Sequence, residues 1–156
     1  MATQYYQIQD FSKHLKNPEK YKGQYPITLR SSWEIKFSIW LDANPSVIEW
    51  SSESIIIPYV SPADNRKHRY FVDFWMMVAE KPSGRIKEYL IEIKPYGQTI
   101  PPKKPARMTK RYVGQVAEYL KNQAKWKAAR EFCDRCQIEN GKDICFVVLT
   151  EKDLPV

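Results

Sequence analysis

The stretches YFVDFWMMV at 70–78 and LIEIKPY at 90–96 decide the fold, because each is an apolar segment of strand length that carries charged residues. Aromatic and β-branched residues predict one strand over 70–79 and a second over 86–94. The residues between them, Pro-Ser-Gly at 82–84, are typical of a turn. The two stretches therefore predict an antiparallel hairpin.

Helix and strand patterns alternate on either side of this hairpin. Before it, apolar residues at helical spacing behind Ser31, a good N-cap, predict a helix over 32–42. Short β-branched segments at 47–50 and 54–60 predict two strands. The polar, basic residues 61–69 that follow predict a loop.

After the hairpin, the proline-rich segment 97–105 cannot be helical and predicts a loop. One or two helices are expected over 109–136, then a turn at Asn140-Gly141 and a buried strand over 144–150. This element order predicts an α/β fold in which helices flank a mixed central sheet.

The 156-residue chain has the length of a single domain, and 43% hydrophobic residues suffice for one core. Residues 1–30 are polar and lack a sustained period, so we expect an N-terminal arm over 1–30 and one folded domain over 31–156. No stretch approaches the roughly 20 apolar residues of a membrane helix, and the first residues lack the order of a signal peptide. These features predict a soluble protein that is not exported.

The chain carries 25 Lys and Arg against 18 Asp and Glu, a formal charge of +7. This excess favours nucleic acid as a partner, with membrane surfaces and acidic proteins as alternatives. The odd number of cysteines, Cys133, Cys136 and Cys145, and the lack of a secretory signal predict reduced thiols. Cys133 and Cys136 form a CxxC, but no histidine is near, so two side chains of a helix are expected rather than a zinc site.

Asp73 is the anomaly in the first stretch, because a carboxylate within an apolar strand is unfavourable unless it is paired, hydrogen-bonded or bound to a metal. The alternative is an acid at a sheet edge that pairs with a nearby Arg or Lys. In the second stretch, strand alternation places Glu92 and Lys94 on one face, about 6 to 7 Å apart, and points Ile91 and Ile93 the other way.

Adjacent strands would bring Asp73 and Glu92 together, where they repel each other unless a divalent cation lies between them. Hard oxygen ligands of this kind suit magnesium or manganese. A cation that activates water, beside a Lys94 ammonium that stabilises developing negative charge, is what phosphodiester hydrolysis requires. The alternative for Lys94 is a solvated ion pair with Glu92.

An acid on one strand, a hairpin and Glu-x-Lys on the next resemble the PD-(D/E)xK nuclease superfamily, although Val72 stands where the proline of that motif is often found. The resemblance implies a restriction-endonuclease-like core with the order αβββαβ. It also implies Mg²⁺ or Mn²⁺ held by Asp73, Glu92 and the backbone carbonyl of Ile93. The catalytic residues implied are Asp73, Glu92 and Lys94.

The same superfamily often places an acid on its first helix, where Glu34 stands in SSWEIKFSIW. The resemblance implies a catalytic role in which Glu34 completes the metal shell, directly or through water. The alternative is a capping box in which Glu34 accepts from the backbone amide of Ser31. Gln115 and Tyr119 form the QxxxY of the exonuclease-like branch, which implies a catalytic Gln115 supported by Tyr119. Such a pair also arises by chance on a polar helix.

From 21 to 154 the chain resembles the head-completion nucleases of contractile-tailed phages, whose core is related to the endonuclease subunit of heteromeric transposases. LRSSWEIKF, KHRYFVDF, IEIKPYGQTIPPKKP and NQAKWKAAREFC carry this resemblance. It implies a Mg/Mn-dependent deoxyribonuclease, an endonuclease acting on double-stranded or branched DNA in the host cytoplasm during assembly, or in the virion. Portal or head-completion proteins are the partners implied. The alternative is a catalytically idle protein that binds DNA ends or docks on the portal with the same fold.

Two basic clusters flank the predicted site and would position phosphates rather than read bases. One precedes the Asp73 strand, and the other follows the Glu-x-Lys strand. For any single residue a solvated loop is the alternative. The candidate DNA-binding residues are Arg30, Arg66, Lys67, His68, Arg69, Lys103, Lys104, Arg107, Lys110 and Arg111.

Overall fold

A computed structural model of the chain describes residues 10–154, so residues 1–9 of the expected arm lie outside the described residues. The elements occur in the order η1 Phe11–His14, η2 Pro18–Lys20, α1 Ser32–Ala43, β1 Val47–Ser52, β2 Ile56–Val60, β3 Lys67–Phe71, β4 Phe74–Glu80, β5 Arg85–Ile93, η3 Tyr96–Gln98, α2 Lys110–Asn140 and β6 Ile144–Leu149. Without β2 and β3 this is the predicted order αβββαβ.

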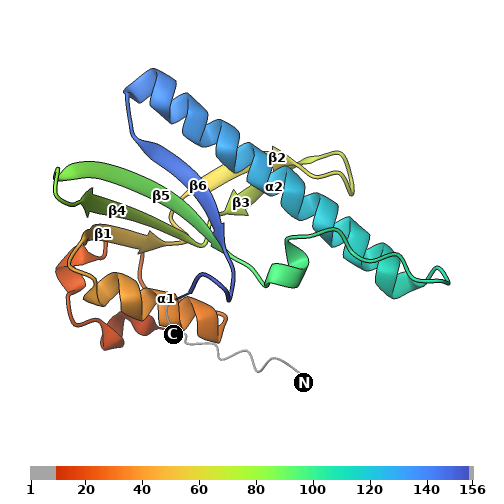
Figure 1. Ribbon diagram of the computed structural model, residues 1–156, viewed down its shortest axis with the longest axis horizontal. Coiled ribbons are helices and arrows are strands. Elements are labelled where there is room, and N and C mark those ends of the chain that lie inside the picture. Colours follow the sequence, from red (N-terminus) through yellow and green to blue (C-terminus); the bar gives the residue numbers. More distant parts are fainter. Residues whose placement is uncertain (1–9, 155–156) are drawn as a thin grey trace.

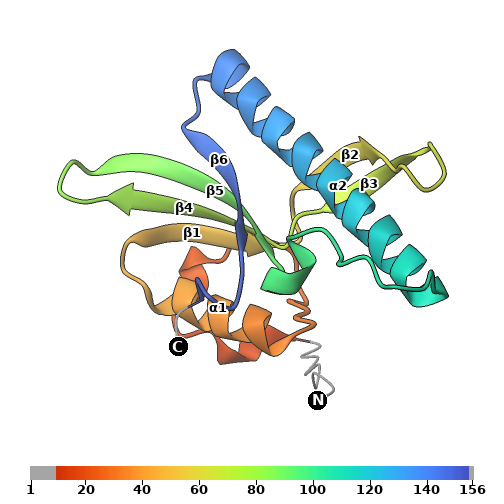
Figure 2. The same cartoon turned by 45° about the vertical axis from the view of Figure 1, so that its right-hand side comes forward.

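The main sheet has four strands in the order β1-β4-β5-β6. Strand β4 is antiparallel to β1 and to β5, whereas β5 and β6 are parallel, so the sheet is mixed as predicted. Strands β2 and β3, which come between β1 and β4 in the sequence, form a separate antiparallel pair. Figures 1 and 2 show this small sheet lying beside α2, away from α1.

The prediction of one strand over 70–79 is wrong, because β3 and β4 are separate strands that part at Val72 and Asp73. At the break, the Val72 amide donates to the Ile55 carbonyl at 3.0 Å. The Glu53 amide donates to the Asp73 carbonyl, also at 3.0 Å. These bonds turn the chain from one sheet into the other, so Asp73 lies at a strand entrance rather than within a strand.

The prediction of a loop over 61–69 is also wrong at its end, since Lys67, His68 and Arg69 belong to β3. Only Tyr70 of this strand is buried. The outer face of a two-stranded sheet faces water, so polar residues are compatible with the strand and conceal it from hydrophobic patterning.

Each face of the main sheet is covered by a different set of elements (Figures 1 and 2). On one face, α1 and residues 10–30 pack against β1, β4 and β5. On the other, α2 packs with β2, β3, β5 and β6. Strand β5 contributes Ile91 and Ile93 to the first core and Leu90 to the second. It is therefore buried on both faces, which is why its end can hold a site in a fixed position.

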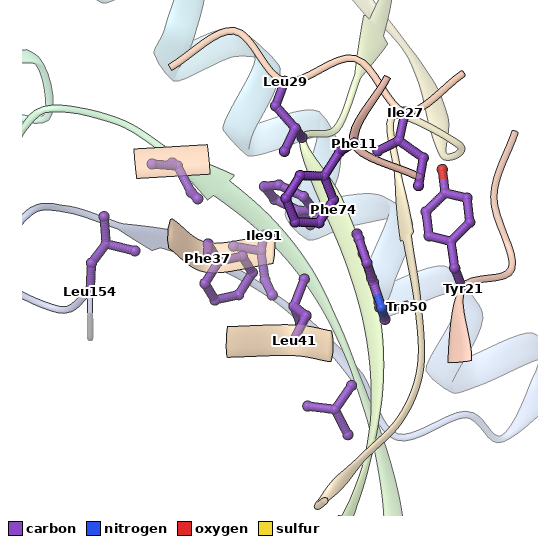
Figure 3. Packing of buried hydrophobic residues seen from close by; sticks show 12 residues of the cluster. Phe11, Tyr21, Ile27, Leu29, Phe37, Leu41, Trp50, Phe74, Ile91 and Leu154 are labelled. Atoms are coloured by element: carbon purple, nitrogen blue, oxygen red, sulfur yellow. The ribbon is translucent and has the colours of Figure 1, made fainter. Parts of the chain in front are cut away.

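The described part of the expected arm is integrated into the first core. Phe11, Tyr21, Ile27 and Leu29 are buried there and converge with residues of α1 and the sheet in Figure 3. The segment is also fastened to the end of α1, since the Asp42 carboxylate accepts from the backbone amides of residues 16 and 17. Irregular backbone spaces these four residues without a helical or strand period, which conceals their burial from sequence reasoning.

Helix α2 is a single helix rather than two. The Thr109 side chain caps its start by accepting from the Tyr112 amide at 3.1 Å. Gly141, with a φ of 64°, ends it in the left-handed conformation that glycine adopts without strain. Cys133 and Cys136 lie on this helix as free thiols, as predicted. Within residues 10–154, none of the helices has the length and apolarity needed to cross a membrane.

Candidate active site

The antiparallel register of β4 and β5 places Asp73 opposite Glu92. Phe74 pairs with Ile91, so the residue before Phe74 faces the residue after Ile91. The Asp73 carboxylate accepts from the backbone amide of Ile93 at 2.9 Å, which fixes its side chain against the end of β5. Both carboxylates line one cavity of about 450 Å³ at this end of the sheet.

Glu92 is held from two sides. Its Oε2 accepts from the Tyr70 hydroxyl at 2.5 Å, and its Oε1 lies 3.3 Å from Lys94 Nζ. Glu92 is 5% exposed, whereas the Lys94 side chain is 21% exposed. Glu92 and Lys94 therefore share a face as expected, but this face is not wholly solvated, because Tyr70 and Leu90 are buried on it.

The electrostatic environment of Asp73 opposes its charge. Burial raises the pKa of the Asp73 carboxyl well above 3.8, and the neighbouring carboxylates of Glu92 and Glu34 raise it further. The Ile93 amide and the Lys94 ammonium counteract this only in part. A cation bound at this point would relieve the repulsion and favour the charged form.

The side chains at this cavity fit a hard divalent cation such as magnesium, which would take most of its ligands from water. Among residues 10–154, no group of three or more His, Cys, Asp and Glu side chains is arranged to hold a metal ion. Two carboxylates, Asp73 and Glu92, remain as the donor set, and magnesium is commonly bound by one or two carboxylates while it keeps several waters. The donors are all hard oxygens, which exclude the soft thiolate environment that zinc prefers in structural sites.

Glu34 enters the same cavity from the first turn of α1. Its amide donates to Ser31 Oγ at 3.2 Å, as an N-cap requires. Its carboxylate accepts from the Arg30 amide at 3.0 Å and not from the Ser31 amide, so the alternative interpretation of Glu34 as part of a reciprocal capping box is wrong in its second bond. Burial raises the pKa of Glu34, and Glu92 contributes to that rise.

The chain is similar in sequence to known nucleases. The family described as TnsA-like endonuclease N terminal matches residues 44–151. The chain belongs to this endonuclease family. The matched span contains Asp73, Glu92 and Lys94 but begins after Glu34. A protein named head completion nuclease, from Enterobacteria phage T4, is 42% identical to the endonuclease over an alignment of 144 residues that covers 89% of each chain. No solved structure matches the chain.

Two residues near the acids of the endonuclease were missed by sequence reasoning. Tyr70 was assigned to an apolar strand, and nothing in the sequence indicates that its hydroxyl reaches Glu92. Lys125 of α2 lines a cavity together with Asp73, Glu92 and Lys94. Its Nζ lies 5.5 Å from the centre of the Tyr70 ring, and burial lowers its pKa. A lysine on a helix rich in lysine gives no signal of its own, because only the packing of α2 on β3 selects it.

The structure does not bring Gln115 to the acidic pair. Gln115 and Tyr119 line a different cavity, which lies between α2 and the segment after η3. Both residues do share a helix face as their spacing predicts. A catalytic Gln115 and a supporting Tyr119 stay predictions.

The basic candidates of the endonuclease lie on exposed surfaces on two sides of the site. Figures 1 and 2 show the tip of β2–β3 and the first turns of α2 extending to the same side of the molecule. Some candidates already have partners: Arg30 pairs with Glu53, and His68 Nε2 lies 2.8 Å from an Asp64 oxygen. The candidates on β3 and before it are Arg66, Lys67, His68 and Arg69, and those on the loop and α2 are Lys103, Lys104, Arg107, Lys110 and Arg111.

Proposed function

We propose that the endonuclease hydrolyses phosphodiester bonds of DNA with Mg²⁺ or Mn²⁺ bound between Asp73 and Glu92. The observation that carries the proposal is the placement of Asp73, just before β4, opposite Glu92 of β5, where the pKa of Asp73 is raised by burial and by Glu92. Lys94 pairs with Glu92 but counteracts the rise in the pKa of Asp73 only in part. The two neighbouring acids therefore still suit a divalent ion.

Each residue of the site has a distinct task in this reaction. When bound, the divalent cation lowers the pKa of water and neutralises phosphate charge. The amide of Ile93 orients Asp73, and the Tyr70 hydroxyl orients Glu92, so both carboxylates are positioned before substrate arrives. Lys94 is close enough to Glu92 to be held in place and exposed enough to meet a phosphate oxygen. Glu34 and the Ile93 carbonyl are further ligand candidates, directly or through water.

The substrate and setting follow from charge and from the relative. The net charge of +7 and the basic residues on both sides of the cavity favour double-stranded or branched DNA. The similar protein of phage T4 is named for head completion. We therefore assign the endonuclease to phage head completion in the host cytoplasm or the virion, where portal or head-completion proteins are the expected docking partners.

The decisive experiment compares cleavage by wild type and Asp73→Ala on linear, branched and supercoiled DNA with magnesium or manganese. Asp143→Ala is the matched control, because Asp143 pairs with Arg85 at the surface, at the other end of β5. Wild type and Asp143→Ala are expected to nick or cut DNA, and Asp73→Ala is expected to be folded and inactive. If wild type cleaves none of these substrates, the hydrolase proposal is wrong, and the alternative of a catalytically idle protein that binds DNA ends or docks on the portal takes its place.

A further inference from the structure

A second cavity adjoins the carboxylate cavity. Its volume is about 640 Å³, and it lies between the proline-rich segment after η3 and the first half of α2. Gln98, the last residue of η3, lines both cavities. A DNA strand whose phosphate lies at Asp73 and Glu92 therefore has this cavity beside it.

Asn122 gives the second cavity an unused hydrogen-bond donor. The side chain is 1% exposed and lines the cavity, and its Nδ2 has no hydrogen-bond partner within residues 10–154. Another amide of the same helix, Gln137, donates to the Ile144 carbonyl at 2.8 Å. A buried amide without a partner is costly, and the cavity that Asn122 lines gives a ligand room to supply the acceptor.

Apart from the carboxylate of Glu118, the rest of the lining suits a nucleotide. Tyr119 presents an aromatic ring, and Pro101 and Pro102 form an apolar wall opposite α2. Lys103 and Arg111 supply positive charge at the same cavity. Aromatic and apolar surfaces stack on bases, and cations meet backbone phosphates, which is the combination that binds single strands.

We propose that the second cavity binds one unpaired nucleotide of the DNA strand, with its base on Tyr119 and a base acceptor at Asn122 Nδ2. Because Asn122 is buried, only a base that has left the duplex stack can reach it. The proposal rests on the proposed function and narrows it: the preferred substrate has a single-stranded end or a branch next to the cut phosphate.

The test measures binding without cleavage. Fluorescence anisotropy is recorded in EDTA with a labelled blunt duplex and with the same duplex carrying a thymidine overhang, at its 3′ end or its 5′ end. Wild type is expected to bind one of the overhang duplexes about tenfold more tightly than the blunt duplex, as stacking of a single base would provide.

Two variants alter the cavity: one fills it, and the other removes its buried donor. A Cβ at Gly114 meets nothing within 4 Å, so Gly114→Phe fills the cavity without a backbone clash. Asn122→Leu removes the donor while it keeps the branching of the side chain, and its thermal stability should equal or exceed that of wild type, since an unpaired buried amide is lost. Both are expected to lose the overhang preference and to keep blunt-end binding. The matched controls are Val113→Phe and Gln123→Leu, whose positions do not line the cavity.

Equal affinity of wild type for blunt and overhang duplexes overturns the proposal, and so does an unchanged preference in both Gly114→Phe and Asn122→Leu. These outcomes are separate from the hydrolase test. Overhang preference without cleavage in magnesium removes the hydrolase and leaves the nucleotide cavity. Cleavage without overhang preference does the reverse.

Discussion

The Tyr70 hydroxyl donates to Glu92 at 2.5 Å, although Tyr70 and Glu92 lie on strands of different sheets. The small sheet therefore supports the carboxylate of the main sheet. We expect Tyr70→Phe to lower metal affinity or cleavage by about 10- to 100-fold, because the loss of a hydrogen bond that orients a metal ligand has effects of this size. Calorimetric titration with manganese measures the metal affinity. Tyr59→Phe is the control, since Tyr59 is buried in the same small sheet but does not line the cavity that Tyr70 shares with Glu92 and Lys94. Equal losses in both variants would contradict a specific role for Tyr70.

Lys125 is expected to contribute a second positive charge at the reacting phosphate. Its half-buried ammonium lines the cavity of the acids, and burial lowers its pKa, so an incoming phosphate gains an incompletely solvated partner. Lys125→Met should reduce the cleavage rate by about 10- to 100-fold, the size of one charge-assisted hydrogen bond. Single-turnover cleavage compares it with Lys127→Met, an exposed lysine of the same helix. A rate equal to that of Lys127→Met would remove Lys125 from the site.

The stability of the metal-free protein should depend on pH through Asp73. The folded-state pKa of Asp73 is raised above 3.8 by burial and by the adjacent carboxylates, while the unfolded chain keeps the ordinary value. The protonated Asp73 carboxyl then makes its full contribution to folding stability below pH 3.8. This contribution is lost as pH rises through the folded-state pKa. Asp73→Asn should lessen this decline, and magnesium should stabilise wild type more than the variant. Urea unfolding in EDTA across this pH range checks the pH dependence, and the same unfolding with magnesium in place of EDTA checks the effect of the metal. Parallel curves of stability against pH for the two proteins would contradict the first expectation.

Salt dependence of DNA binding should identify the phosphate contacts. Lys103 and Lys104 are exposed on the segment beside the second cavity. If both neutralise phosphates, the double Lys→Gln variant should reduce the slope of log affinity against log salt by about 2, since each phosphate contributes roughly 0.9. The matched control is Lys13→Gln with Lys16→Gln, two exposed lysines in η1 and just after it. An unchanged slope in the Lys103 and Lys104 variant would show that these two lysines stay solvated.

The elements of the main sheet could be predicted because their patterns are local. Ser31 as a cap, the alternation of Glu92 with Ile91 and Ile93, and the Asn140-Gly141 turn each need only a few neighbouring residues. The hairpin of β4 and β5 follows from the same information, and it brings Asp73 to Glu92.

The remaining parts depend on contacts between segments far apart in sequence. The break at Asp73 arises from a bond to Glu53, and the role of Tyr70 arises from the folding of β3 over β5. Lys125 and Asn122 are ordinary residues of a polar helix until α2 packs. Hydrophobic periodicity reports burial and not the identity of the partner, so these four could not be found from the pattern alone.

The segment 53–73, which contains β2 and β3, is closed at its base. There the Glu53 amide donates to the Asp73 carbonyl, and Ser52 of β1 pairs with Phe74 of β4. Its tip, residues 61–66, can therefore change in length and charge while Asp73 and Glu92 keep their register. Substrate shape and hydrolytic chemistry are separable traits in such a chain. Directed evolution toward new DNA forms should begin by diversifying that tip.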